Sequence, residues 1–309
     1  MIADLECVLP ELLEGLNAAY RGQVCIGGVS VRIIGSRSQD VTFDQTLAPF
    51  FVEAGDSDID IGVEWVPELS RSSARKLFDS GTTWRLYECE AGFQFDFGVL
   101  STGSQLHKRL LVDQRFRRAV LQMNAKYFTH FPEAADPLGY PLDELLIMHR
   151  LTQERAIELH GCGIVGPEGA SNLFVGHSGA GKSTTTRLWT AHEDVDVLSD
   201  DRIIVRDHSG QIFMYGTPWH GEAAFASPGR APLRRIFILE HGRENVLTRL
   251  SKSQAVAELF ARSFVPFHRH EYVDSALSFL EYVADSIPCY RYAFEPEQAA
   301  VERILELRD

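Results

Sequence analysis

Residues 176–183 restrict the possible folds of this 309-residue chain more than any other segment. Gly176–Ser183 satisfies the pattern G-x-x-x-x-G-K-[ST]. The segment Asn172–Val175 before it is typical of a strand, and Lys182–His192 after it is predicted to be a helix. In this context the glycines let backbone N–H groups point at an anion, and the positive end of the helix adds to the attraction. The segment therefore predicts a loop that binds the phosphates of a nucleoside triphosphate, expected to be ATP with Mg²⁺.

Two side chains of this loop have specific expected roles. Lys182 would carry its positive charge to the β- and γ-phosphates, and the hydroxyl of Ser183 would be a ligand of Mg²⁺. The residues expected to contact the nucleotide are Gly176, His177, Ser178, Gly179, Ala180, Gly181, Lys182, Ser183 and Thr184.

An acidic pair, Asp200 and Asp201, follows the next predicted strand, Val195–Asp200. The helix after the loop rises about 1.5 Å per residue, roughly 16 Å in all, and the strand returns about 3.3 Å per residue, roughly 20 Å. Because these lengths nearly cancel, a crossover brings the acids to the same sheet edge as the loop. There one carboxylate can hold Mg²⁺ and another can accept the proton of an attacking hydroxyl. The alternative is a solvated turn, since aspartate pairs are common in turns.

Composition limits the classes of protein to which the chain can belong. Apolar residues make up 45% and charged residues 24%, the balance of a globular protein with a sizeable core. The net charge of −13 repels phosphate backbones, so we expect no nucleic-acid partner. Apolar runs fall far short of the roughly 20 residues that cross a bilayer, and acids stand near the start where a secretory signal carries Lys or Arg. With five scattered cysteines, the expected location is the cytoplasm, with no membrane partner.

The length favours two domains, and Pro132–Pro141 has the proline and glycine content of a connector. We place the boundary between residues 135 and 136. The first domain, residues 1–135, is predicted to be a strand-rich α+β domain of unknown role. Helical periodicity covers Leu5–Tyr20 and Gln105–Phe131. Expected strands of this domain are Val24–Ile34, Ile59–Trp65, Thr83–Glu88 and Phe93–Val99.

The second domain, residues 136–309, is predicted to be an α/β domain built around the phosphate-binding loop. Helices are expected at Asp143–Gln153, Ala255–Phe264, Asp274–Ala284 and Glu297–Leu307. Further strands are expected at Ala156–Val165 and Cys289–Phe294. The sequence has no internal repeat and no low-complexity segment.

Three acids at alternate positions, Asp56, Asp58 and Asp60, invite comparison with the D-x-D pair of nucleotidyltransferases. In nucleotidyltransferases a Gly-Ser pair comes shortly before such acids, but Gly35-Ser36 lies too far upstream of these. Alternation with the apolar residues of Ile59–Trp65 favours the solvent face of a half-buried strand instead.

The second half of the chain resembles the HPr kinase/phosphorylase family, whose core is shared with phosphoenolpyruvate carboxykinases. Besides the loop, His160-Gly161 is similar to the family's histidine-glycine pair, and Asp200–Ile203 resembles its D-D-R-V segment. Glu222 lies about where the family carries a magnesium-binding glutamate, and Arg249-Leu250 is similar to its catalytic arginine segment. The resemblance covers roughly Pro141–Asp309 and implies a P-loop kinase core.

This resemblance also implies roles for single residues, with Asp201 as the proton acceptor. The implied catalytic set is Asp201, Lys182, His160 and Arg249, and the implied Mg²⁺ ligands are Ser183, Asp200 and Glu222. Without the resemblance, His160 is more typical of a packed histidine and Arg249 of a solvated surface arginine, whereas Glu222 fits an exposed acid equally well. The family signature E-[IV]-R-G-[LI]-G is replaced here by Tyr215–Glu222, and the N-terminal half matches no family domain. The chain is closer to divergent HPr-kinase-like proteins, some of which resemble peptide-tailoring kinases.

We therefore expect a kinase that transfers the γ-phosphoryl group of ATP to a hydroxyl, that of a serine in a protein or peptide. A homo-oligomer is compatible with this expectation. Two alternatives stay open. One is a small-molecule kinase or a carboxykinase on the same core. The other is a non-catalytic, nucleotide-gated binding protein, against which the retention of Asp200 and Asp201 argues.

Overall fold

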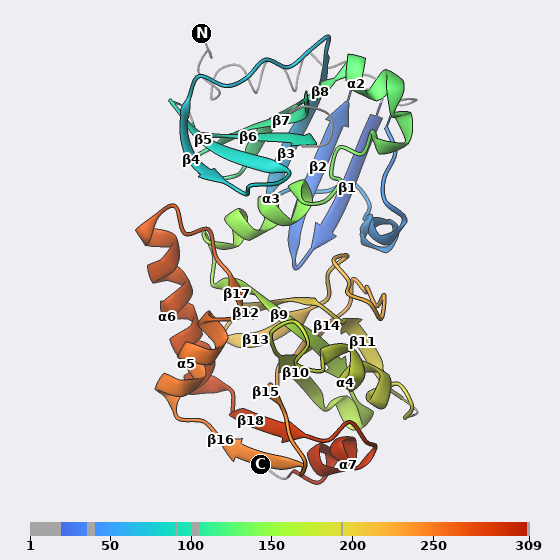
Figure 1. Cartoon of the computed structure of the whole chain (residues 1–309), viewed down its shortest axis with the longest axis vertical. Coiled ribbons are helices and arrows are strands. Elements are labelled where there is room, and N and C mark those ends of the chain that lie inside the picture. The colour runs from blue at the N-terminus through green and yellow to red at the C-terminus, as the bar shows by residue number, and fades with distance from the viewer. Residues whose placement is uncertain (1–19, 36–40, 91, 100–104, 193, 308–309) are drawn as a thin grey trace. The chain divides into compact units, whose positions relative to one another are not determined.

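The computed structural model describes residues 20–35, 41–90, 92–99, 105–192 and 194–307, and the chain is mixed α/β with two large sheets (Figure 1). It divides into two compact units. The first comprises the chain up to Arg150 except residues 26–28, and the second comprises those three residues and the chain from Leu151 onward. Residues 136–150, assigned by sequence to the second domain, group with the first unit.

The first unit contains an eight-stranded sheet with the order β1-β2-β3-β8-β7-β6-β5-β4. Its strands are β1 Tyr20–Ile26, β2 Val29–Gly35, β3 Ile59–Val66, β4 Arg75–Asp79, β5 Trp84–Cys89, β6 Gly92–Val99, β7 Gln105–Asp113 and β8 Arg118–Asn124. Strand β3 pairs in parallel with β2 and β8, and β4 to β8 form an antiparallel meander. The helices of this unit are η1 Gln45–Phe50, α2 Ala125–His130, η3 Pro132–Ala134 and α3 Leu142–Leu151.

The helix predicted over Gln105–Phe131 is wrong. The segment forms β7, β8 and only then the short helix α2. Along β7, every second side chain is buried, which is the two-residue period of a strand. One of these core positions holds Lys108, and this charge hides the apolar alternation from a sequence pattern.

One other predicted strand of the first unit is two strands, and one predicted helix lies mostly outside the described residues. The strand predicted over Val24–Ile34 is divided by a turn at Gly27 and Gly28, whose φ angles of 59° and 76° favour glycine. The predicted helix Leu5–Tyr20 lies outside the described residues except for Tyr20, which begins β1.

The second unit contains a ten-stranded sheet with the order β14-β13-β12-β9-β10-β15-β18-β16, with β11 and β17 also paired to β9. Its strands are β9 Ala156–Val165, β10 Ser171–Val175, β11 Asp196–Ser199, β12 Arg202–His208, β13 Gln211–Tyr215, β14 Arg230–Pro232, β15 Arg235–His241, β16 Val246–Arg249, β17 Ser263–Phe264 and β18 Cys289–Phe294. Its helices are η4 Pro167–Gly169, α4 Lys182–Trp189, α5 Lys252–Phe260, α6 His270–Ser286 and α7 Ala299–Leu305. Thus the strands predicted at Ala156–Val165 and Cys289–Phe294 are confirmed with the same bounds.

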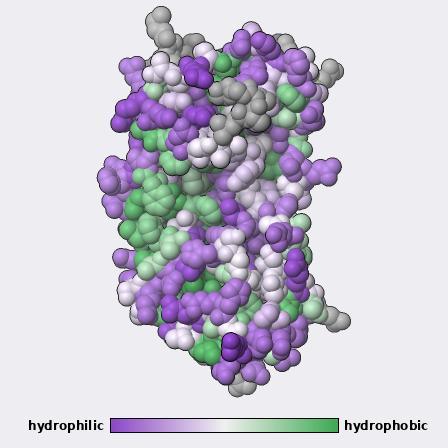
Figure 2. Space-filling model, viewed as in Figure 1, coloured by the Kyte–Doolittle hydropathy of each residue, from purple (hydrophilic) through white to green (hydrophobic). Residues whose placement is uncertain are grey.

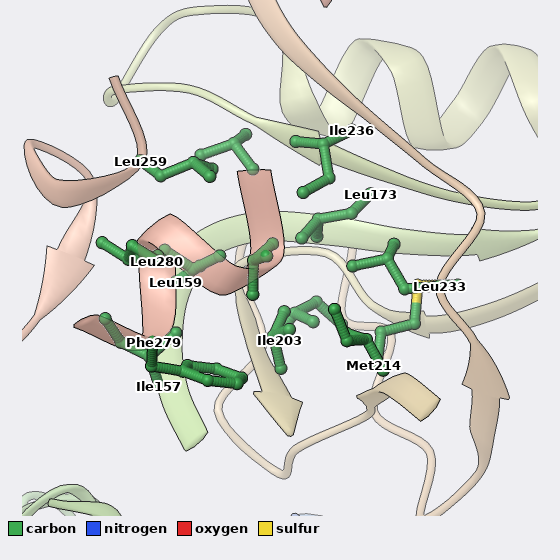
Figure 3. Packing of buried hydrophobic residues seen from close by; sticks show 14 of the residues in the cluster. Ile157, Leu159, Leu173, Ile203, Met214, Leu233, Ile236, Leu259, Phe279 and Leu280 are labelled. Carbon is green, nitrogen blue, oxygen red and sulfur yellow. The ribbon is translucent and has the colours of Figure 1, made fainter. Parts of the chain in front are cut away.

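Two apolar clusters hold the second unit together, one on each face of its sheet. The larger joins the sheet to α5 and α6, and Figure 3 shows Leu159, Leu173 and Ile236 packed with Leu259 and Leu280. The smaller contains aromatic residues of the sheet, Trp189 of α4 and three residues of α7. Each fully buried aliphatic or aromatic side chain contributes roughly 1.5–3 kcal/mol, so both faces fix the sheet on which the loop is built.

The surface agrees with the composition. Hydrophilic residues cover much of the face shown in Figure 2. None of the helices in the described part of the chain has the length and apolar character needed to cross a bilayer.

Candidate phosphate-transfer site

The glycine-rich segment forms the connection between β10 and α4 (Figure 1). Gly179 and Gly181 have φ angles of 81° and 103°, a region that side chains with a Cβ rarely adopt. A Cβ on Gly176 would approach that of Ala180 to 2.7 Å, so the loop also turns tightly upon itself. The loop has the glycine-dependent backbone expected of an anion cradle at a helix N-terminus.

Lys182, the first residue of α4, folds back over this loop. Its Nζ donates to the carbonyl oxygens of Gly176 at 3.1 Å and His177 at 3.3 Å. Burial lowers the pKa of Lys182 from its ordinary value, although the charge of Asp201 acts in the opposite direction. The ammonium group is therefore held beside the loop by weak carbonyl partners, which phosphate oxygens can replace. Ser183 and Thr184, next along the helix, are half-buried.

Strand β9 joins the loop to the acidic pair. The backbone N–H of Gly176 donates to the carbonyl of His160 at 3.2 Å, and that of Gly161 donates to the carbonyl of Asp201 at 3.0 Å. Both β10 and β11 are antiparallel to β9, so they run parallel to each other with β9 between them. Their carboxyl ends therefore meet at one edge of the sheet, and the acids arrive at the loop, as the lengths of helix and strand predict.

The side chains of His160 and Asp201 meet at this edge. The His160 Nε2 lies 2.9 Å from the Asp201 Oδ1, and the other oxygen of Asp201 accepts from Arg202. Arg202 also pairs with the buried carboxylate of Glu158, its Nε lying 3.4 Å from Oε1. The ring of Phe264 covers this group, with the Arg202 guanidinium 4.1 Å from its centre.

These neighbours set the charge of Asp201. Burial raises its pKa, but the hydrogen bond from His160 and the charges of Arg202, His160 and Lys182 outweigh burial, and the pKa lies below its ordinary value of 3.8. Asp201 is thus a carboxylate at neutral pH, and its hydrogen bond with His160 requires the Nε2 to be the donor. The aspartate is oriented, ionised and about a quarter exposed.

Asp200 has different surroundings from its neighbour. It is 1% exposed, and its carboxylate accepts backbone N–H groups of Gly221 at 2.9 Å, Ala223 at 2.8 Å and Phe225 at 3.3 Å. It therefore anchors the turn over residues 221–225. Glu222 lies in this turn with an exposed side chain, so the structure brings it to the same edge as the acidic pair.

Arg249 is not brought to this edge beside the loop. It ends β16, the outermost strand, three strand positions from β10, which at about 4.8 Å per strand is about 14 Å. Its Nη1 lies 3.5 Å from the hydroxyl of Tyr290, over whose ring the guanidinium sits.

Arg262 is a cation near the loop that the sequence patterns did not select. The backbone N–H of His160 donates to its carbonyl at 2.8 Å, and its charge is the first cause of a lowered pKa at His177. Its Nη1 pairs with Glu258 at 2.6 Å, and Glu258 also binds Arg291 at 2.7 Å. No motif contains this arginine, because only the pairing of β17 with β9 brings it close.

Among the described residues, no group of three or more His, Cys, Asp or Glu side chains is arranged to hold a metal ion by itself. The donor set still fits Mg²⁺ bound together with a nucleotide, because Mg²⁺ then takes one or two protein oxygens plus phosphate oxygens and water. Ser183 at the start of α4, Asp200 and Glu222 on the turn that Asp200 binds would supply such oxygens.

No protein-family model matches the chain, and no curated protein matches it. The functional conclusion therefore rests on the motifs and on the geometry of this edge.

Proposed function

We propose that this protein is an ATP- and Mg²⁺-dependent kinase that transfers the γ-phosphoryl group to a hydroxyl, that of a serine in a protein or peptide. The observation that carries the proposal is the meeting of His160 and Asp201, 2.9 Å apart, where β9 also binds the first residue of the glycine-rich loop. A phosphate cradle and an oriented carboxylate at one sheet edge are the two parts that hydroxyl phosphorylation requires.

The loop and Lys182 would hold the triphosphate. Backbone N–H groups of the loop bind phosphate oxygens, and Lys182 exchanges its carbonyl partners for the β- and γ-phosphates. Ser183 would ligate Mg²⁺ together with Glu222, and Mg²⁺ held there would neutralise charge on the phosphates. Asp200 contributes by fixing the turn that carries Glu222, and its remaining lone pairs leave it available as a Mg²⁺ ligand.

Asp201 would act on the acceptor. The acceptor hydroxyl donates to this carboxylate, its oxygen forms the new P–O bond, the bond from the γ-phosphorus to the bridging oxygen breaks, and ADP leaves. The proton passes to Asp201. Its low pKa makes it a weak base, so orientation of the hydroxyl is its main early contribution, and the proton moves late. His160 keeps the carboxylate in place.

The core is proposed to be of the HPr kinase/phosphoenolpyruvate carboxykinase type. Three features support this: the strand, loop and helix in sequence, the position of His160-Gly161 on the strand that binds both loop and acids, and Arg202 after the acidic pair. Arg249 remains a proposed catalytic residue only on the resemblance.

The test is phosphoryl transfer by Asp201→Asn at saturating Mg²⁺. Candidate proteins and peptides are incubated with ATP labelled at the γ-phosphate and analysed by mass spectrometry. The variant keeps the shape of the side chain and loses its basic lone pair, so transfer should fall about 10²–10⁴-fold. Binding of a fluorescent ATP analogue should change little, because Lys182 and the backbone supply the phosphate contacts.

Transfer at the wild-type rate would refute the role of Asp201. Tight ATP binding by the wild type, with no acceptor labelled by the wild type in any fraction, would favour the nucleotide-gated binding protein instead.

A further inference from the structure

Strand β6 of the first unit has a polar face that is shielded from solvent. Phe93, Phe95 and Phe97 point into the core, so the alternating Gln94 and Asp96 point to the opposite face of the sheet. Such a face of an antiparallel sheet is normally solvated. Yet Gln94 is 3% exposed and Asp96 1% exposed. Something in the chain therefore covers this face.

The irregular segment over residues 67–74, between β3 and β4, lies over part of this face, and we call it the strap. Arg109 of β7 holds the strap to the sheet. Its guanidinium binds both oxygens of Asp96, at 2.6 and 2.9 Å, and its Nη2 also donates to the carbonyl of Ser70 at 2.7 Å. Gln94 donates to the same Asp96 at 2.9 Å. Buried Asp96 is therefore neutralised by Arg109 and serves as the anchor of the strap.

Two cavities lie along the strap, and both are lined by Arg71 and Ser72. One has a volume of about 430 Å³ and contains Glu88 and Glu90 in its wall. The other, which we call the cationic cavity, has a volume of about 410 Å³. The cationic cavity is lined by Arg71, Ser72, Lys76, Arg85, Tyr87, Asp96 and Leu106.

Charge is uneven in the cationic cavity. Its three basic residues come from three different elements: Arg71 from the strap, Lys76 from β4 and Arg85 from β5. Asp79 binds two of them, with its Oδ2 2.8 Å from the lysine and 3.2 Å from the Arg85 Nε. One carboxylate thus serves two cations. Asp96, the carboxylate that lines the cavity, is already paired with Arg109, and Lys76 and Arg85 share Asp79, so the wall keeps a positive excess in a chain whose net charge is −13.

We propose that the cationic cavity binds a small molecule that carries a phosphate or a carboxylate group. Guanidinium groups bind such oxyanions through paired hydrogen bonds, and the hydroxyl of Tyr87 adds a neutral donor. A volume of about 410 Å³ lies in the usual range of ligand sites, about 300–1,000 Å³. The neighbouring cavity sets Glu88 and Glu90 against Arg71 and Arg109, so it lacks this positive excess and suits an anion less well. This site is separate from the proposed phosphoryl transfer and does not depend on it.

The proposal is tested by calorimetric titration of the full chain with inorganic phosphate, with citrate and with glycerol as the neutral probe. Because the glycine-rich loop also attracts phosphate, each titration is repeated with Lys182→Ala. We expect binding of phosphate or citrate that persists in this variant and weakens as salt is raised. The preferred probe tells which oxyanion the cavity takes. Glycerol should give no heat of binding.

Arg85→Gln and Arg71→Gln should each weaken that binding about tenfold or more, since each removes a charged hydrogen-bond donor. Arg75→Gln is the matched control, because Arg75 is 71% exposed on β4 and does not line the cavity. A lower circular dichroism signal would indicate that Arg85→Gln perturbs the fold. In that case the affinity of Arg71→Gln decides, because Arg71 lies in the strap and outside the sheet. Wild-type affinity in both cavity variants, loss of binding in Lys182→Ala, or no binding of either anion overturns the proposal.

Discussion

The carboxylate of Asp201 accepts a hydrogen bond of 2.9 Å from His160, a residue 41 positions earlier in the chain. The contact follows from the register of β12 on β9, in which Arg202 lies opposite His160. A backbone pairing therefore decides which histidine orients the acid. The same β9 residues bind the loop and Asp201, so the phosphate cradle and the acid are positioned by one element.

His160→Gln tests this contact. The hydrogen bond from His160 lowers the pKa of Asp201, so its loss should raise that pKa toward 3.8. Phosphoryl transfer should fall about 10–100-fold, while ATP affinity changes less than about threefold, because the histidine touches the acid and not the loop side chains. Carbon-13 NMR titration of the Asp201 carboxyl checks the first outcome. An unchanged titration together with unchanged transfer would show that the contact has no influence.

Asp200→Ala should destabilise the second unit. The substitution leaves three backbone N–H groups without their acceptor, at a cost of roughly 2–5 kcal/mol in the free energy of unfolding. Urea denaturation measures this loss of unfolding free energy. Glu222→Gln is the control, since its exposed side chain should leave the urea midpoint unchanged. If Asp200→Ala unfolds at the wild-type urea concentration, the carboxylate does not anchor the turn.

Two glycines of the loop should differ in their tolerance of alanine. At Gly181 an added Cβ meets both an unfavourable φ of 103° and the ring of Phe294 at 2.7 Å, whereas at Gly179 only the φ of 81° is unfavourable. Gly181→Ala should therefore weaken ATP binding at least tenfold more than Gly179→Ala, as fluorescence titration would reveal. Adding Phe294→Leu should recover part of the loss. Equal affinities for the two alanine variants would contradict this account.

Sequence patterns located the loop because its chemistry is local. Glycines, Lys182 and Ser183 are adjacent in the chain, and the apolar strand before them is continuous. The acidic pair was located because a helix and a strand of similar length must return to their starting edge. In both cases the deciding distances lie within one crossover.

Contacts between distant strands could not be predicted in this way. Arg262 is brought near the loop by β17, a two-residue strand that no sequence pattern marks, and Arg249 is kept away by the order of the strands. In the first unit, Lys108 occupies a core position of β7. Its charge interrupts the apolar alternation, so the sequence pattern predicted a helix where a strand forms. Such positions are set by tertiary packing, which overrides local periodicity.

Lys182→Ala and Ser183→Ala should separate phosphate from metal binding. Loss of the lysine removes the charge from the β- and γ-phosphates, so ATP affinity should fall steeply while circular dichroism is unchanged. Loss of the hydroxyl should instead raise the Mg²⁺ concentration needed for half-maximal ATP binding. The check is an ATP titration at several Mg²⁺ concentrations. Identical titrations for the wild type and both variants would show that the loop does not bind the nucleotide.

Because of Lys108, the free energy of unfolding of the first unit should change with pH in the alkaline range. The side chain is 5% exposed, its Nζ donates to the carbonyl of Asp136 at 2.8 Å, and burial lowers its pKa from 10.5 to about 8. Between these two values the unfolded chain holds a proton that the folded chain has released. The free energy of unfolding should therefore rise with pH across this window, by roughly 2–3 kcal/mol at most.

Lys108→Met replaces the titrating ammonium group with an apolar side chain of similar volume. It should therefore abolish the rise in the free energy of unfolding and stabilise the unit near pH 7. Urea denaturation at pH 7.5 and pH 10 measures the free energy of unfolding in each protein. Trp189 and Trp219 are replaced by phenylalanine, so that the fluorescence of Trp65 and Trp84 reports unfolding of the first unit. Other groups that titrate at alkaline pH do so in both proteins, so the comparison isolates the lysine. A rise in stability of the same size in Lys108→Met and in the protein with Lys108 would show that this lysine keeps its ordinary pKa in the folded unit.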